Sequence, residues 1–204
     1  MGLVDDLAAR VRALSANTPR RVLIGIAGAP GSGKTTLAEA LTCVLGGFPS
    51  VAHVPMDGFH LADVELVRLG RRERKGAPDT FDRDGYRALL ARIAAGESVW
   101  APSFERVLEQ PIAQAIPVVE QTRIVISEGN YLLLPSWREV RARFDEVWFC
   151  RQHDPTRIDR LIARHVHFGK TPDEARAWVL RSDESNAALV AATADAADLT
   201  VEID

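Results

Sequence analysis

Apolar residues follow two different patterns at the start of the chain. Leu3, Leu7, Val11 and Leu14 recur at the spacing of one helix face, whereas residues 22–27 (VLIGIA) form a short and nearly continuous apolar run. The first pattern is typical of an amphipathic helix, and the second is typical of a strand that is buried on both faces of a parallel sheet. A helix followed by a buried strand is therefore predicted at the N-terminus.

Similar runs and periodicities continue to the end of the chain. Further strands are predicted at residues 51–56, 124–126, 147–149 and 199–203. Helical stretches are predicted between them, at about residues 35–45, 61–69, 83–95, 136–144, 155–167 and 172–192. Because strands that alternate with helices form βαβ units, we expect an α/β fold, a three-layer sandwich in which helices flank a parallel five-stranded sheet.

Two stretches do not fit this alternation. Residues 70–81 are rich in Arg, Lys and Gly and are predicted to form a polar loop. Residues 97–122 contain three prolines and leave room for an extra hairpin. Since no repeat or shift in composition marks a second domain, we expect a single domain over residues 1–204.

Composition narrows the class of protein and partner. Of the 204 residues 47% are hydrophobic and 26% charged, and a formal net charge of −3 gives no general basic surface for nucleic acid. The N-terminus is too charged for a signal peptide, and no apolar run approaches the roughly 20 residues of a membrane helix. Cys43 and Cys150 are interpreted as reduced thiols. We therefore expect a cytoplasmic protein without a nucleic-acid or membrane partner, and the sequence predicts no oligomeric state.

The strongest motif lies between the first predicted strand and the helix that follows it. Residues 28–35 read GAPGSGKT and match the pattern GxxxxGK[ST], whose glycines let backbone N–H groups curl around phosphates. Lys34 is expected to reach the β- and γ-phosphates of ATP, and the Thr35 hydroxyl is expected to ligate Mg²⁺. The predicted nucleotide-binding residues of this segment are Gly28, Ala29, Pro30, Gly31, Ser32, Gly33, Lys34, Thr35 and Thr36.

An acidic residue follows each of two predicted inner strands. Asp57 comes directly after residues 51–56, and Glu128 comes shortly after residues 124–126. In an open parallel sheet both would face the ligand crevice beside the glycine-rich loop. Because phosphoryl transfer to an alcohol needs a carboxylate near Mg²⁺ and another near the acceptor hydroxyl, we expect Glu128 to hold Mg²⁺ and Asp57 to act as general base. The chain has no Asn-Lys-x-Asp segment of a GTPase, and no DxxG switch follows the third predicted strand, where residues 126–131 read ISEGNY.

Three further segments carry a more specific pattern. They are MDGFH at residues 56–60, RKGAPDTFD at residues 74–82 and EGNYLLL at residues 128–134. Together they resemble the uridine kinase, pantothenate kinase and phosphoribulokinase superfamily, and most of all its bacterial nucleoside or nucleotide kinase-like subgroup, also labelled fructose-transport-system kinases. The resemblance runs from about residue 21 to residue 192. It implies that Asp57 is the catalytic aspartate, that Glu128 is linked to magnesium and that Asp79 binds hydroxyls of the acceptor.

The chain departs from uridine kinases at the acceptor. His60 stands where those enzymes have an aromatic residue, and residues 103–106 hold no clear counterpart of their Tyr and His pair for uracil. His60 is a candidate to contact the acceptor, as is Arg106, whose guanidinium suits an anionic group. For Asp79 and Arg106 the alternative is a salt bridge that pins a loop. The resemblance thus implies the fold and the reaction, and it does not name the acceptor.

A basic helix is predicted towards the C-terminus. Arg157, Arg160 and Arg164 fall on one face of it, and the segment at about residues 157–171 resembles the arginine-bearing lid that closes over ATP in these kinases. Arg160 is expected to bind ATP, and Arg164 to act in catalysis by stabilising charge on the transferred group. Arg157 is a third candidate of the same kind.

The interpretation that the sequence favours is an ATP-dependent kinase that uses Mg²⁺ and transfers the γ-phosphate to a hydroxyl of a nucleoside, a sugar or a pantothenate-like acceptor. A nucleotide kinase, which transfers to a phosphate, would need no general base, so Asp57 and Asp79 argue against it. A P-loop NTPase that acts as a protein-binding switch is the other alternative. Turnover that depends on an added alcohol would favour the kinase, and turnover stimulated only by a protein would favour the switch.

Overall fold

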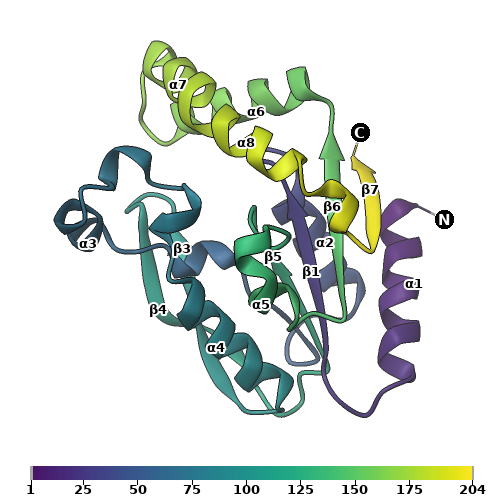
Figure 1. The fold of residues 1–204 in the computed structure, drawn as a ribbon. Coiled ribbons are helices and arrows are strands. Elements are labelled where there is room, and N and C mark those ends of the chain that lie inside the picture. The colour runs from purple at the N-terminus through teal and green to yellow at the C-terminus, as the bar shows by residue number, and fades with distance from the viewer. Residues whose placement is uncertain (1, 204) are drawn as a thin grey trace.

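A parallel sheet forms the centre of the molecule. The structure is a computed structural model that describes residues 2–203 of the chain. Its main sheet has five parallel strands in the order β2-β5-β1-β6-β7 (Figure 1). They are β2 (Val51–His53), β5 (Ile124–Glu128), β1 (Val22–Gly28), β6 (Glu146–Gln152) and β7 (Leu199–Ile203). The predicted α/β class and the parallel five-stranded sheet are confirmed.

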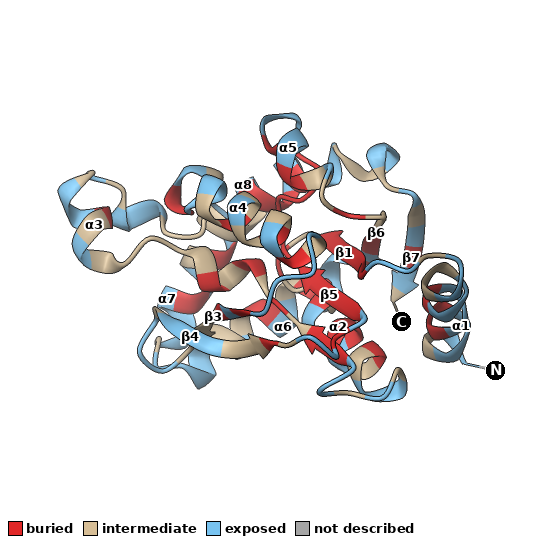
Figure 2. Cartoon of the chain, turned by 90° about the horizontal axis from the view of Figure 1, so that it is seen from below, coloured by how far each residue is buried: buried red, intermediate tan, exposed pale blue. Residues whose placement is uncertain are grey.

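Helices cover both faces of this sheet and enclose two apolar cores. One face carries α1 (Leu3–Ala16) and α2 (Lys34–Val44), and the other carries α4 (Arg83–Ala94), α5 (Arg138–Arg141) and α8 (Glu184–Ala191). In β1, Ile24 and Ile26 pack into the first core and Leu23 into the second, since successive strand side chains point to opposite faces. Every residue of β1 is therefore buried, and Figure 2 shows β1 and β5 as a buried centre beside the exposed outer face of α1.

An antiparallel hairpin lies outside the main sheet. Strand β3 (Val99–Glu105) pairs with β4 (Gln110–Val118), which confirms the hairpin expected within residues 97–122. The hairpin packs against the 3₁₀ turn at Met56–Phe59, close to the carboxyl end of β2. A Cβ on Gly58 would overlap the backbone of Pro102, so the glycine allows the turn and the hairpin to approach closely.

The segment between this turn and α4 leaves the sheet and returns. It contains α3 (Asp63–Arg68) and 3₁₀ turns at Arg72–Arg74 and Pro78–Thr80. Its two ends are joined at the base, because the Leu61 N–H donates to the Thr80 carbonyl at 2.9 Å and the Asp82 N–H donates to the Phe59 carbonyl at 2.8 Å. The predicted polar loop is thus a closed excursion with local structure of its own.

The C-terminal helices lie over the carboxyl ends of the strands (Figure 1). They are α6 (Asp154–His167), α7 (Pro172–Trp178) and α8, the last two joined by a π-helical turn at Val179–Asp183. The prediction of one regular helix over residues 172–192 is therefore wrong in its middle. A π turn inserts an extra residue into the helical repeat, so it changes the direction in which the following side chains point.

The second strand also differs from its prediction. Strand β2 ends at His53 rather than at residue 56, and it lies at an edge of the sheet, so Asp57 does not follow an inner strand as predicted. Within residues 2–203, none of the helices has the length and apolar character needed to cross a membrane. The location in the cytoplasm stays a prediction.

Candidate active site

The glycine-rich loop joins β1 to α2 and forms the base of the site. Gly31 and Gly33 have φ angles of +80° and +85°, left-handed conformations that glycine adopts without strain. A Cβ on Gly31 would lie 2.8 Å from Cγ of Leu161 and 2.9 Å from the carbonyl oxygen of Arg157. The loop therefore depends both on its glycines and on close contact with α6.

Arg157 holds this loop against the C-terminal helices. Its side chain is only 2% exposed, and its guanidinium donates to the carbonyl oxygen of Pro30 at 3.2 Å. It also donates to the carboxylates of Asp154 at 3.1 Å and Glu184 at 2.5 Å. Since these protein oxygens engage its donors, Arg157 lies behind the loop as a supporting residue, and an ATP contact by Arg157 is not favoured.

The polar side chains of the loop fit a triphosphate and a divalent cation. The Lys34 ammonium is buried and donates to the Ala29 carbonyl at 2.9 Å. Burial lowers its pKa, although the negative charge of Glu128 acts in the opposite direction. The Thr35 hydroxyl donates to Oε1 of Glu128 at 3.2 Å, so the two predicted Mg²⁺ ligands are neighbours. Oγ of Ser32 is buried without a partner among residues 2–203. A buried ammonium, paired oxygen ligands and an unpaired hydroxyl suit phosphate oxygens and Mg²⁺.

Asp57 and Glu128 line one cavity but differ in acidity. Nη2 of Arg106 donates to Oδ2 of Asp57 at 2.7 Å. Burial acts to raise the pKa of Asp57, but the positive charges of Arg106, Lys34 and Arg164 keep this pKa below its usual range. The pKa of Glu128 is raised, first by burial and then by the charge of Asp57. Asp57 is therefore the stronger acid of the pair and stays ionised at neutral pH.

His60 lies against the backbone of Asp57. Its Nδ1 is 2.8 Å from the Asp57 carbonyl oxygen, and burial lowers the pKa of the ring, which keeps it neutral. Because a carbonyl oxygen only accepts, Nδ1 carries the proton and Nε2 is left as an acceptor. The ring packs between Phe81 and Phe104, at centroid distances of 4.0 and 4.7 Å. His60 is thus an oriented, uncharged part of the wall beside Asp57.

A cavity of about 420 Å³ brings most of the predicted site residues together. Its walls include Pro30, Gly31, Lys34, Thr35, Asp57, His60, Arg106, Glu128 and Arg164. A second cavity of about 490 Å³ shares part of the glycine-rich loop with the first, and its walls add Gly33, Thr36 and Arg160. Gly28, Ala29 and Ser32 lie within the loop itself. The two cavities therefore meet at the predicted phosphate cradle.

Asp79 lies outside the walls of both cavities and, unlike Gly28, Ala29 and Ser32, it does not belong to the phosphate-binding segment that borders them. Its carboxylate is held by Arg74 at 2.5 Å and lies 3.5 Å from Nε of Arg71, at a side-chain exposure of 41%. This is the loop-pinning salt bridge that the sequence left open as the alternative. Binding of the acceptor by Asp79 stays a prediction, and the geometry does not favour it.

Several residues of the first cavity were missed by sequence reasoning. The excursion between the turn at Met56–Phe59 and α4 contributes Asp63, Arg72 and Lys75. The π turn and α8 contribute Asp183 and Asn186. Of these residues only Lys75 had a signal in the family motifs, since it belongs to the RKGAPDTFD segment. The Tyr131 hydroxyl, from the EGNYLLL segment, donates to the carbonyl of Gly76, from the RKGAPDTFD segment, and so fastens the excursion beside the site.

The fold and the site together define a P-loop kinase, because a phosphate cradle and two carboxylates meet at the carboxyl ends of a parallel sheet. The model of the phosphoribulokinase / uridine kinase family matches residues 23–203, and the chain belongs to this family. The resemblance inferred from its motifs is confirmed. The chain is therefore an ATP-dependent small-molecule kinase, and the protein-switch alternative is not supported.

Individual relatives agree with the family. A Schizosaccharomyces pombe protein provisionally assigned as a uridine kinase, C227.14, is 37% identical over 185 residues, which are 84% of this chain and 78% of that protein. The uncharacterised Escherichia coli protein YggC is 34% identical over 194 residues, or 92% of this chain and 80% of that protein. A crystal structure from Silicibacter sp. TM1040, provisionally assigned as a fructose transport system kinase, has a TM-score of 0.84 at 36% identity and covers 96% of this chain and 98% of its own.

Proposed function

We propose that this kinase transfers the γ-phosphoryl group of ATP to a hydroxyl of a small metabolite, with Asp57 as the base that accepts the hydroxyl proton. The observation that carries the proposal is that Asp57, Lys34, Glu128 and Arg164 line one cavity beside the glycine-rich loop. Transfer to an alcohol needs an ionised carboxylate at the acceptor and cations around the transferred group. These four side chains supply both.

The nucleotide lies across the two cavities in this proposal. Lys34 and the N–H groups of the loop hold the phosphates in the first cavity. The second cavity takes the adenosine, between Thr36, Arg160 and apolar side chains such as Leu37 and Ile203. Segment 157–171 serves as the lid. This role is supported by the fact that the segment contributes wall residues to both cavities.

Magnesium belongs beside the phosphates. Thr35 and Glu128 would hold it, because their oxygens are adjacent and oxygen ligands are those that Mg²⁺ prefers. When bound, ATP supplies the phosphoryl group and Mg²⁺ draws negative charge from its oxygens. A bound cation also keeps Glu128 ionised, against the burial and the Asp57 charge that otherwise raise its pKa.

Asp57 acts on the acceptor. As the hydroxyl oxygen bonds to the γ-phosphorus, its proton passes to the Asp57 carboxylate, and the bond to the bridging oxygen breaks to leave ADP. A carboxylate of low pKa takes a proton late, once the forming bond has made the hydroxyl acidic, and this suits a loose transition state. Arg106 holds Asp57 in place through the 2.7 Å salt bridge, and Arg164 stabilises charge on the transferred group.

Release of ADP in the presence of Mg²⁺ and a panel of alcohols tests this role. Asp57→Asn keeps the shape of the side chain and removes the base, so we expect acceptor-dependent kcat to fall by about 100- to 10,000-fold. Asp84→Asn is the matched control, since Asp84 is an exposed carboxylate of α4 that pairs with Arg83. An Asp57→Asn enzyme as fast as its Asp84→Asn counterpart would show that Asp57 is not the base.

A further inference from the structure

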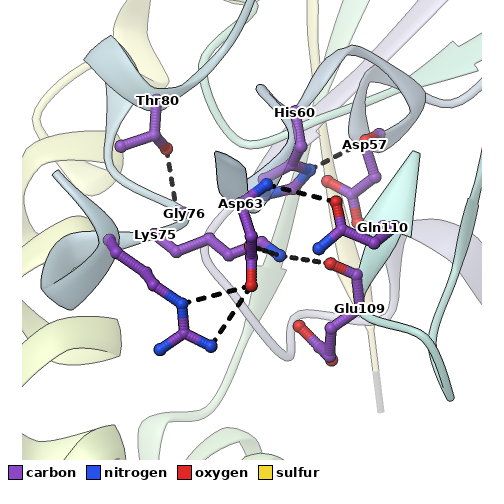
Figure 3. Close-up of polar contacts among 9 residues, drawn as sticks. Asp57, His60, Asp63, Lys75, Gly76, Thr80, Glu109 and Gln110 are labelled. Carbon is purple, nitrogen blue, oxygen red and sulfur yellow. Dashed lines mark hydrogen bonds and ion pairs between the residues drawn. The ribbon is translucent and has the colours of Figure 1, made fainter. Parts of the chain in front are cut away.

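The cavity contains a second, partly buried lysine that the transfer step does not use. The Lys75 side chain is 12% exposed, and its ammonium donates to Oδ1 of Asp63 at 2.6 Å and to the backbone carbonyl of Glu109 (Figure 3). The ammonium also lies over the Phe104 ring, 5.5 Å from its centroid. A lysine ammonium has three N–H donors, and these contacts use two of them. The third is available to a ligand in the cavity that Lys75 lines.

Lys75 is held in place by its own loop. The N–H of the next residue, Gly76, donates to Oγ1 of Thr80 at 3.0 Å, and the Gly76 carbonyl accepts from the Tyr131 hydroxyl (Figure 3 shows the first of these contacts). The ammonium therefore enters the cavity from a fixed backbone position. A preorganised cation binds an anion with little loss of conformational entropy.

Two cations, Lys75 and Arg72, share the carboxylate of Asp63. Asp63 faces both Lys75 and Arg72, whose guanidinium is 3.2 Å from Oδ2 of Asp63, and all three line the cavity. The Glu109 carboxylate lines it as well, but Glu109 is exposed on the hairpin turn, where water screens its charge. Arg72 is itself more than half exposed, so Lys75, which is far less exposed, is the group best placed to hold an anion.

The aromatic side chains at this end are already engaged. The His60 ring packs on Phe81 and Phe104, and Arg106 lies over the Phe104 ring at 5.3 Å, in addition to Lys75. A nucleobase is bound by stacking on such faces, and here they are covered by other side chains of the same wall. The wall therefore suits a polar aliphatic molecule better than a nucleoside.

We propose that Lys75, assisted by Arg72, binds an anionic group of the acceptor, which is a small non-aromatic alcohol that carries a carboxylate or a phosphate. This deepens the proposed function and rests on it, because Asp57 takes the hydroxyl of the same molecule. Asp63 orients the Lys75 ammonium and does not contact the transferred group. Sequence reasoning offered Arg106 for an anionic group of the acceptor and Asp79 for its hydroxyls, and we give the anionic group to Lys75 instead.

Matched pairs of alcohols test the proposal. Each pair shares a carbon skeleton and differs in one anionic group: D-glycerate and glycerol, glycerol 3-phosphate and glycerol, and pantothenate and its alcohol analogue, with uridine as the aromatic acceptor. For the wild-type enzyme we expect kcat/KM of the anionic member to exceed that of its neutral partner by about 10- to 100-fold. This ratio corresponds to the free energy of one hydrogen bond between charged groups. Comparison of D-glycerate and pantothenate with glycerol 3-phosphate then shows whether the anionic group that is preferred is a carboxylate or a phosphate.

Variants of Lys75 then locate the effect. Lys75→Met should remove the preference by raising KM for the anionic acceptor, and Lys75→Arg should restore part of it, which a merely structural role would not do. Arg68→Met is the control, because Arg68 is an exposed cation of α3 that pairs with Glu65. If neutral alcohols or uridine react at least as well, in an Asp57-dependent way, the anionic acceptor is refuted while the kinase stands. If no alcohol is phosphorylated, the proposed function itself fails.

Discussion

The nucleotide end and the acceptor end of the cavity are built in different ways. The phosphate cradle at the nucleotide end comes from one continuous segment between a fully buried strand and a helix, with Lys34 and Thr35 at the start of α2. The acceptor end is assembled from the turn at Met56–Phe59, the excursion that carries Asp63 and Lys75, and the β3–β4 hairpin. The first is a local backbone structure, and the second exists only after tertiary packing.

This difference has a functional consequence. A cradle of backbone N–H groups binds phosphate in the same way whatever the acceptor is. The acceptor wall instead consists of side chains on loops, which tolerate change more readily than the sheet does. We therefore expect substitutions at the nucleotide end to act on all substrates alike, and substitutions at the acceptor end to act on particular acceptors.

Among substitutions at the nucleotide end, the largest effect is expected at Lys34. Lys34→Met removes the buried ammonium that neutralises the transferred phosphates, and we expect kcat/KM to fall by about 1,000-fold. The loss should be equal, within about threefold, for every acceptor that wild type accepts, and initial rates at varied ATP measure it. A loss confined to one acceptor would contradict the claim that the nucleotide end acts on all acceptors alike.

A smaller effect is expected where the cradle is supported from behind. Arg157→Met removes the contacts to the Pro30 carbonyl and to Glu184, and it should destabilise the fold by about 2 kcal/mol and weaken ATP binding. Denaturant unfolding and ATP titration measure the two effects. Arg151→Met is the control, because Arg151 forms an exposed pair with Glu202. Equal stability of the two variants would mean that the Arg157 contacts do not support the loop.

The smallest effect is expected at Asp79. Its carboxylate pairs with arginines outside the cavity, so Asp79→Asn should change kcat/KM by about twofold or less for each acceptor. Asp79→Asn also distinguishes the salt bridge seen in the structure from the acceptor-binding role that the family resemblance implies. If Asp79 held acceptor hydroxyls, its replacement would raise KM by far more than twofold. Steady-state rates with the preferred acceptor are sufficient for this comparison.

The sequence was most informative where structure is local. The apolar run before Gly28 predicts β1, and the glycine pattern predicts the cradle, because both depend on short-range backbone geometry. The alternation of strands and helices predicts the parallel sheet. It does not predict the π turn at Val179–Asp183, since a one-residue insertion in a helical repeat leaves the apolar pattern almost unchanged.

Side-chain roles on one helix or loop were harder to predict. Helical spacing groups Arg157 with Arg160 and Arg164, yet contact with Pro30 and Glu184 buries the first of them. In the excursion, Asp79 and Lys75 look equally polar in sequence. The contacts that hold Lys75 at the cavity depend on tertiary packing: the Tyr131 hydroxyl binds the carbonyl of the next residue, Gly76, across 55 positions, and Lys75 itself pairs with Asp63.

The central claim is that Asp57 serves the acceptor and not the nucleotide. Its most direct test combines ATP titration of Asp57→Asn with mass spectrometry of the acceptor after incubation with ATP and Mg²⁺. The account predicts wild-type affinity for ATP, within about twofold, and little or no phosphorylated acceptor, while wild type forms it readily. Phosphorylated acceptor at the wild-type rate, or ATP affinity lost together with activity, would contradict the account.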